Sequence, residues 1–325
     1  MFKARRVAGR VPEFTLFYAG DIHGSEKCFR KFVNAARFYK VDALILGGDI
    51  SGKALVPLVE RDDSTFKVHF MGNDQILRSE EDLEAMENAI RFNGFYPFRI
   101  READLADLAA DDASRAGYFD RIMSDELRRW IALADERLGD SGTQCLIMPG
   151  NDDEVFTGPV LDEAEYVINP DCRVTDVGPF QVLSVGYSNI TPWNSPREMS
   201  EEQLDEVIRG LEGGLDSSRP LILNLHVPPY DSSLDFAPLL REDLSIVGGS
   251  NPQMVPVGSR AVRSAIERLQ PVLSLHGHIH ESRGSVQIGR SVAVNPGSEY
   301  NTGILRGVIV RLREDEVVST QFVSA

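Results

Sequence analysis

The stretch TLFYAGDIHG, residues 15–24, is a mostly apolar run that ends in a glycine, a carboxylate and an imidazole. A short apolar run of this kind predicts a buried strand, and Asp21 and His23 follow where that strand ends. In an α/β fold, ligands bind in the crevice outside the carboxyl ends of the strands. The stretch therefore predicts an α/β fold with a polar site at its strand ends.

Four further apolar runs are followed by the same residue types. Asp, Asn and His side chains recur there together with glycines, which tight turns favour. So many oxygen and imidazole ligands exceed what one ion needs, which indicates a centre with two metal ions. Ligands of nitrogen and oxygen without thiolates suit Mn, Fe or Zn. The runs and their polar clusters are 43–46 before Gly47-Gly48-Asp49, 145–148 before Gly150-Asn151-Asp152-Asp153, 221–225 before His226, and 272–275 before Gly277-His278-Ile279-His280.

The order of these motifs, D-x-H, GD, GN, a lone His and GHxH, resembles that of the calcineurin-like metallophosphoesterase superfamily. The resemblance runs from about Phe14 to about Tyr300, apart from one long insertion. The segments GDIHG at 20–24, HVPP at 226–229 and GHIHE at 277–281 are similar to the predicted bacterial and archaeal phosphoesterases of that superfamily. The resemblance implies a β sandwich flanked by helices, in the layer order α-β-β-α, and two divalent ions, with Mn favoured.

The resemblance also implies a role for each cluster. Because His278 and His280 are two positions apart, an extended segment would point both to one side, where they could meet neighbouring ions. The residues expected to take part in catalysis are Asp49, Asn151, Asp152 and His226. One metal is expected on Asp21, His23 and His280, the other on Asn151, His226 and His278, with Asp49 bridging the two.

The chemistry of phosphate esters explains these residue types. Two divalent cations about 3.5–4 Å apart can hold a bridging hydroxide, neutralise the phosphoryl oxygens and fix in-line geometry. A carboxylate suits the bridging position because its charge and two oxygens can serve both ions. We therefore expect attack by a hydroxide between the metals on a small phosphomonoester or phosphodiester, such as a nucleotide.

Asp152 departs from the family pattern, which usually has His at this position. A carboxylate with an ordinary pKa near ~3.9 is ionised at neutral pH and cannot donate a proton. The enzyme would then rely on its metals alone, prefer good leaving groups, or use a donor from elsewhere. His69 is one such donor candidate, although a solvent-exposed histidine is the commoner case.

A contrasting function is a weakly catalytic or non-catalytic relative whose metal site is structural and whose insertion binds a partner. The complete ligand set favours the enzyme, and Asp152 favours the alternative. Taken alone, Asp21 and Asn151 would be ordinary turn or cap residues. His276 has no ligand position in the pattern, so we assign it a structural role.

We expect residues 1–325 to form one catalytic domain with an insertion or cap at about 53–115. Strand-like 65–70 and helix-like 80–92 lie within it, and GND at 72–74 reads as a hairpin turn. Its aromatic residues form either the core of the cap or part of a substrate pocket: Phe92, Phe95, Tyr96 and Phe98. A helix at 118–138 should pack on the main sheet.

Composition narrows the class of protein. The net charge of −16 argues against a non-specific nucleic-acid binder, which needs a basic surface. No apolar run approaches the ~20 residues of a membrane span, and the basic N-terminus lacks the apolar core of a secretory signal. The three cysteines, an odd and sparse set, suggest free thiols in a reducing compartment, which places the protein in the cytoplasm. No motif specifies an oligomeric state.

Overall fold

The computed structural model describes residues 13–52, 55–110, 112–241, 243–249 and 251–325. The basic N-terminus considered above for a targeting signal lies outside these residues. The described part is a mixed α/β fold, so the predicted class is confirmed. Its helices are α1 (Glu26–Tyr39), α2 (Glu80–Phe92), α3 (Glu102–Ala110), α4 (Asp112–Leu138), α5 (Thr157–Leu161), α6 (Glu201–Glu212) and α7 (Arg260–Leu269), with a short 3₁₀ helix η1 (Tyr300–Thr302).

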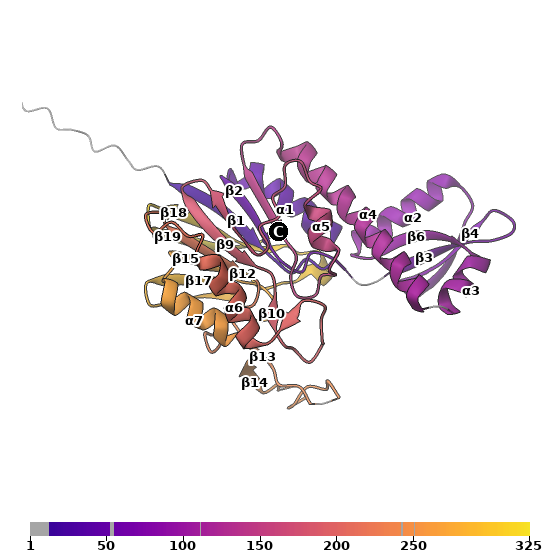
Figure 1. Cartoon of the computed structure of the whole chain (residues 1–325). Coiled ribbons are helices and arrows are strands. Elements are labelled where there is room, and N and C mark those ends of the chain that lie inside the picture. Colours follow the sequence, from indigo (N-terminus) through magenta and orange to yellow (C-terminus); the bar gives the residue numbers. More distant parts are fainter. Residues whose placement is uncertain (1–12, 53–54, 111, 242, 250) are drawn as a thin grey trace, which may run out of the picture.

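Two large sheets form the centre of the molecule (Figure 1). In both, parallel strands are bordered by antiparallel strands at one or both edges. In strand order, the first sheet is β19 (Glu316–Ser324), β18 (Arg306–Arg313), β1 (Phe14–Ala19), β2 (Ala43–Gly47) and β7 (Gln144–Met148). The second is β16 (Gly284–Ile288), β17 (Ser291–Asn295), β15 (Leu273–Leu275), β12 (Leu221–Leu225), β9 (Phe180–Val185) and β8 (Arg173–Val177).

A fully buried apolar layer joins the two sheets. Leu16 and Ile45 of the first sheet pack in one cluster with Val182 and Ile222 of the second. On the outer faces, α1, α4 and α5 cover the first sheet, and α6 and α7 cover the second. The layer order is therefore helix, sheet, sheet, helix.

Helix α1 begins immediately after the first polar cluster. The Ser25 hydroxyl caps it by accepting from the backbone N–H of Cys28, and Glu26 places a negative charge in the first turn. Phe29 and Phe32 bury its apolar face against the first sheet. The helix ends at Lys40, which takes a left-handed conformation. This geometry holds the D-x-H loop between β1 and α1.

The segment after β2 builds a second small unit beside the main sheets (Figure 1). Helix α2 packs on its four strands around a separate apolar core that contains Leu58, Val68 and Ile90. The expected helix at 80–92 is confirmed. The GND segment is only partly the hairpin turn that was expected: Gly72 lies in the turn with Met71, whereas Asn73 and Asp74 already belong to β5. In strand order the sheet is β5 (Asn73–Leu77), β4 (Phe66–Phe70), β3 (Leu55–Glu60) and β6 (Tyr96–Arg101).

Helix α4 returns the chain from the insertion to the main body. It begins at Asp112 rather than at the expected residue 118, so the boundary predicted at 115 lies inside a continuous helix. The missed first turns, DASRAG at 112–117, have almost no apolar periodicity. Trp130 of the same helix stacks on Phe29 of α1, at 4.5 Å between ring centroids.

Polar contacts attach the insertion to the loops at the strand ends. The buried Tyr96 hydroxyl of β6 accepts from the backbone N–H of Gly52, at 2.7 Å. Arg91 of α2 donates to Glu126 of α4, also at 2.7 Å. Arg129 then joins Glu126 to Glu26 of α1. The small sheet is thereby fixed to the segments that flank the polar clusters.

The four aromatic residues of the insertion have different surroundings. Phe95 packs against the small core, Tyr96 is buried at the junction, and Phe98 contacts Tyr118 edge-on. Phe92 is 56% exposed, with the Lys27 ammonium 4.9 Å from its ring centroid. Of these four rings, only that of Phe95 therefore packs in the apolar core of the insertion.

The long segment that follows β12 contains a short hairpin. Strand β13 (Phe236–Pro238) pairs antiparallel with β14 (Met254–Pro256). A further short parallel pair joins β10 (Ser188–Asn189) to β11 (Glu198–Met199).

No helix in the described part is long and apolar enough to cross a membrane. The three cysteines are free, as expected.

Candidate metal centre

The polar clusters from both sheets meet at one end of the sandwich. The backbone N–H of Asp21, after β1, donates to the Gly48 carbonyl after β2, at 2.9 Å. Across the second sheet, the N–H of Gly277 donates to the carbonyl of His226, also at 2.9 Å. Six of the seven predicted ligands thereby fall into two groups, Asp21 with His23 and His280, and Asp49 with His226 and His278.

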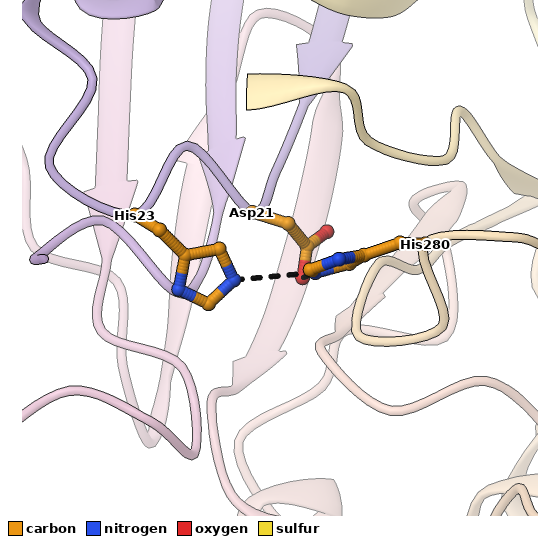
Figure 2. Close-up of side chains that lie close together, drawn as sticks. All are labelled: Asp21, His23 and His280. Carbon is orange, nitrogen blue, oxygen red and sulfur yellow. Dashed lines mark hydrogen bonds and ion pairs between the residues drawn. The ribbon is translucent and has the colours of Figure 1, made fainter. Parts of the chain in front are cut away.

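The first group contains one ligand atom from each of three side chains, and its imidazoles face one another (Figure 2). The Nε2 atoms of His23 and His280 are 3.2 Å apart, and Nε2 of His280 lies 3.6 Å from Oδ1 of Asp21. Oδ1 accepts from the backbone N–H of His278, whereas the buried Oδ2 has no hydrogen-bond partner in the described structure. A buried oxygen of this kind fits a metal ligand, because a cation would satisfy it.

The second group lies deeper in the sandwich. Nε2 of His226 is 3.4 Å from Oδ2 of Asp49 and 3.0 Å from Oδ1 of Asn151. Oδ2 of Asp49 also lies 3.8 Å from Nε2 of His23, which belongs to the first group. One carboxylate oxygen therefore lies between imidazoles of both groups. This is the place that the sequence assigned to a bridging ligand.

The charges in the centre depend on one another. Burial alone would raise the pKa of the Asp49 carboxyl, but the His226 imidazole outweighs burial and holds that pKa below its ordinary range. Burial would lower the pKa of His226, and Asp49 instead raises it to about 9. Burial, assisted by the charge on His226, lowers the pKa of His278 to about 4. The carboxylates are thus ionised, as metal ligation requires.

Hydrogen bonds fix the orientation of the buried imidazole. Nδ1 of His226 lies 2.9 Å from the carbonyl oxygen of Gly47. An Nδ1–H that donates to this carbonyl keeps that proton in place, so the proton lost on metal binding would be the one on Nε2, which is directed at the centre. Such a bond on the far nitrogen is how proteins usually orient a metal-binding histidine.

Four of the ligand residues have an unusual backbone. Asp21, His23, Asp49 and His278 have φ values of 55°, 38°, 51° and 65°, in the left-handed region. Non-glycine residues in this region carry strain, which gathers at functional sites. The expectation of an extended segment at 278–280 was therefore wrong. The chain turns at His278 because of its positive φ, and its imidazole and that of His280 join different groups.

Two glycines allow the loops to approach this closely. A Cβ on Gly150 would lie 2.2 Å from Oδ1 of Asp49, and a Cβ on Gly277 would lie 2.3 Å from Oδ2 of Asp21. Neither distance is compatible with a side chain. The glycines of the motifs therefore make room for the carboxylates beside them.

Two buried charged residues outside the ligand set hold the GN loop in place. Asp153 accepts from the backbone N–H groups of Gly150 and Ser51, both at 2.7 Å, and so joins the GN and GD loops. Arg197 donates from Nε to the Gly150 carbonyl, at 3.0 Å, and pairs with Asp171. Sequence reasoning missed Arg197, because a single arginine in a polar loop has no distinguishing pattern.

Tyr300 also escaped the sequence analysis. Its ring centroid lies 4.6 Å from that of His23 and 5.8 Å from that of His280, so it contacts both imidazoles of the first group. The chain makes a turn at 295–298, at the end of β17, where Gly297 has a φ of 67°. The hydroxyl of Ser298 in that turn donates to the backbone carbonyl of Asp21, at 2.6 Å.

The remaining histidines have separate environments. His276 is fully buried, with Nδ1 2.7 Å from the Leu225 carbonyl and Nε2 2.8 Å from the Ser274 hydroxyl, which agrees with the structural role expected for it. His69 lies in the hairpin of the insertion, where its exposed ring contacts Asp74 at 2.8 Å. That position makes His69 a surface residue rather than a proton donor.

Comparison with known proteins supports the fold and leaves the activity open. No family model matches the chain. A segment of 156 residues, 47% of the chain, is 31% identical to the uncharacterized protein MJ1162 of Methanocaldococcus jannaschii, and the match spans 63% of that protein. One crystal structure aligns with 96% of this chain and 99% of its own, at a TM-score of 0.56 and 15% identity. The protein TT1561 of Thermus thermophilus aligns over 93% and 99%, at a TM-score of 0.52 and 15% identity. These structures share the fold.

Proposed function

We propose that the chain is a dinuclear metal-dependent phosphoesterase of the calcineurin-like superfamily, which hydrolyses a small phosphomonoester or phosphodiester such as a nucleotide. The observation that carries the proposal is the position of Asp49, whose Oδ2 lies between His226 of one ligand group and His23 of the other. Two ligand groups that share a carboxylate are what a two-metal hydrolase requires.

Each side chain has a distinct task in this proposal. Two bound divalent ions supply Lewis-acid neutralisation of the phosphoryl oxygens and activation of water. Asp49 holds the two groups together, and Asn151 directs its amide oxygen into the second group. Asp152 places a carboxylate where the family usually has an imidazole, so the proposal includes no imidazole proton donor at this position. Esters of acidic alcohols, which leave without protonation, are therefore the favoured substrates.

The types of ligand narrow the choice of metal, and the net charge narrows the choice of substrate. Imidazole, amide and carboxylate donors suit Mn, Fe or Zn, and the resemblance favours Mn. The net charge of −16 disfavours nucleic acid as a substrate, whereas a small anionic ester can be bound through the metals. The free cysteines fit a reducing compartment, which we take to be the cytoplasm.

Hydrolysis of bis-p-nitrophenyl phosphate and p-nitrophenyl phosphate tests the proposal. Protein stripped of metal is assayed after addition of Mn, Fe(II), Zn or Mg, beside the Asp49→Asn variant. We expect metal-dependent turnover that falls at least ~100-fold in Asp49→Asn, the scale seen when a group that stabilises the transition state is lost. Asp74→Asn, in the distant hairpin of the insertion, is the matched control and should keep wild-type activity.

Two outcomes would contradict the proposal. Turnover that is equal with and without metal would exclude a metal-dependent mechanism. Tight binding of two metal ions without hydrolysis of either ester would instead support the non-catalytic relative, in which the insertion binds a partner.

A further inference from the structure

Asp152 has three separate contacts at the edge of the metal centre. Its backbone N–H donates to Oδ1 of Asp49, at 2.9 Å, and its Oδ1 accepts from the hydroxyl of Ser195, at 2.8 Å. Its second oxygen, Oδ2, lies 3.8 Å from Nδ1 of His23. The carboxylate is partly buried, with 22% of the side chain exposed. Two hydrogen bonds therefore fix the position of Asp152, and its Oδ2 is directed at Nδ1 of His23, the ring nitrogen on the side away from the centre.

We propose that Asp152 is a positioning residue, whose carboxylate faces Nδ1 of His23 and orients that imidazole for metal binding through Nε2. The proposal rests on the metal centre of the proposed function and assigns a role to the residue that departs from the family pattern. In this proposal the charge of Asp152 supports a metal ligand electrostatically. The family usually has a histidine at this position.

The two ring nitrogens of His23 face different surroundings. Nε2 lies within 3.2 Å of Nε2 of His280 and 3.8 Å of Asp49, so it points into the centre. Nδ1 points towards Asp152. A negative charge beside Nδ1 favours the tautomer that has its proton there, which leaves Nε2 free to bind a cation. At 3.8 Å the contact is electrostatic rather than a hydrogen bond.

The comparison with His226 supports this assignment. His226 has the carbonyl of Gly47 at its Nδ1, so its backbone surroundings already fix the tautomer. For His23 the facing acceptor is a side chain, and it comes from a different loop. Histidine at position 152 would remove the negative charge that favours a proton on Nδ1. The backbone donation to Asp49 would remain, since it does not depend on the side chain.

Ser195 is the second component of this arrangement. Its hydroxyl holds Oδ1 of Asp152, which leaves Oδ2 to face His23. Ser195 belongs to the loop that ends at Arg197, and Arg197 is anchored to the Gly150 carbonyl of the GN loop. The carboxylate is thus held by the loop that carries it and by a neighbouring loop.

Metal binding by the whole protein tests the role directly. Zinc affinity and stoichiometry are measured by competition with a chromophoric chelator for wild type, Asp152→Asn, Ser195→Ala and Asp74→Asn. Asp74 contacts His69 at 2.8 Å, so Asp74→Asn removes a carboxylate from an imidazole away from the centre and is the matched control. We expect Asp152→Asn to weaken one of two sites by about 10–100-fold, the usual effect of losing a partner of a metal-binding histidine. Ser195→Ala should weaken the same site less.

A double-mutant cycle and a spectrum show whether Asp152 acts through His23. In a His23→Asn background, Asp152→Asn should have no further effect on zinc affinity. Nitrogen-15 spectra of the zinc-loaded wild type should show His23 protonated at Nδ1, and this resonance should shift in Asp152→Asn. A structural role confined to folding would move neither measurement.

The possible results separate this inference from the proposed function. If Asp152→Asn binds both zinc ions as tightly as wild type, the positioning role is overturned and the metal centre stands. If the two substitutions weaken zinc binding independently, Asp152 does not act through His23. If the wild type itself fails to bind two ions, both proposals fail together.

Discussion

At the scale of single residues, the centre depends on side chains whose charge is set by burial and by one neighbour. Asp49 stays ionised although it is 3% exposed, because its carboxylate faces an imidazole of the second group. His276 is the opposite case, since its ring is fully buried among carbonyl groups and a hydroxyl. Two fully buried histidines therefore differ by their surroundings: His226 faces the Asp49 carboxylate of a candidate ligand group, and His276 does not belong to either group.

The buried His276 makes stability depend on pH. Burial lowers its pKa from 6.5 to about 4, so the folded protein keeps it neutral while the unfolded chain protonates it below about 6.5. The stabilisation is complete above pH 6.5 and is lost as the pH falls towards 4, because the unfolded state then binds the additional proton. The loss amounts to about 3 kcal/mol.

Urea unfolding of metal-free protein between about pH 7 and pH 4 measures this effect. The His276→Asn variant should be less stable at neutral pH but should lose less stability across the same range. Parallel profiles for the two proteins would show that another group causes the dependence.

At the scale of elements, loops at the strand ends are held by neighbouring parts of the chain. Asp153 ties the GN loop to the GD loop, and Arg197 anchors the GN loop from the segment after β9. Tyr96 of the insertion holds the end of the GD loop through Gly52. The insertion therefore helps to hold a loop of the candidate metal centre, although none of its described residues belongs to either ligand group.

Removal of one hydroxyl tests this contact between elements. The Tyr96→Phe variant leaves the buried N–H of Gly52 without its partner, and we expect a loss of about 1–3 kcal/mol in the free energy of unfolding. Tyr118→Phe is the control, because its hydroxyl lies 3.4 Å from the Arg99 carbonyl at an exposed position, and its cost should stay within about 0.5 kcal/mol. Equal stability of wild type and Tyr96→Phe would show that the contact does not anchor the insertion.

At the scale of the whole molecule, the proposed metal ions connect the two sheets. Asp21, His23 and Asp49 follow strands of the first sheet, whereas His226, His278 and His280 follow strands of the second. Each ligand group contains residues from both sheets. Metal binding should therefore stabilise the sandwich as a unit.

Calorimetry with and without a chelator measures that stabilisation. An ion at about 100 times its dissociation constant contributes about 2.7 kcal/mol if it binds only the folded state. Two ions should therefore raise the Tm by roughly 5–10 °C in a protein of this size. The Asp49→Asn variant should respond much less, and an unchanged Tm in the wild type would indicate that no ion connects the sheets.

The fold could be predicted to a large extent from local patterns. Apolar runs and glycines located the central strands, and the helix expected at 80–92 was found at those residues. The start of α4 was missed, because the sequence of its first turns has no apolar stripe. The hairpin of β13 and β14 was missed because each strand has only three residues.

The sequence by itself determined which side chains follow the strands, because hydrophobic periodicity and motif order are written in the chain. Only the tertiary structure decided how those side chains group, since grouping depends on contacts between loops that are distant in sequence. Thus His278 and His280 separate through a left-handed turn, and Asp152 faces Nδ1 of His23 across two loops. The contacts of Tyr300 with His23 and of Arg197 with the GN loop were found only in the structure. These contacts are set by the packing of the two sheets, which no local pattern encodes.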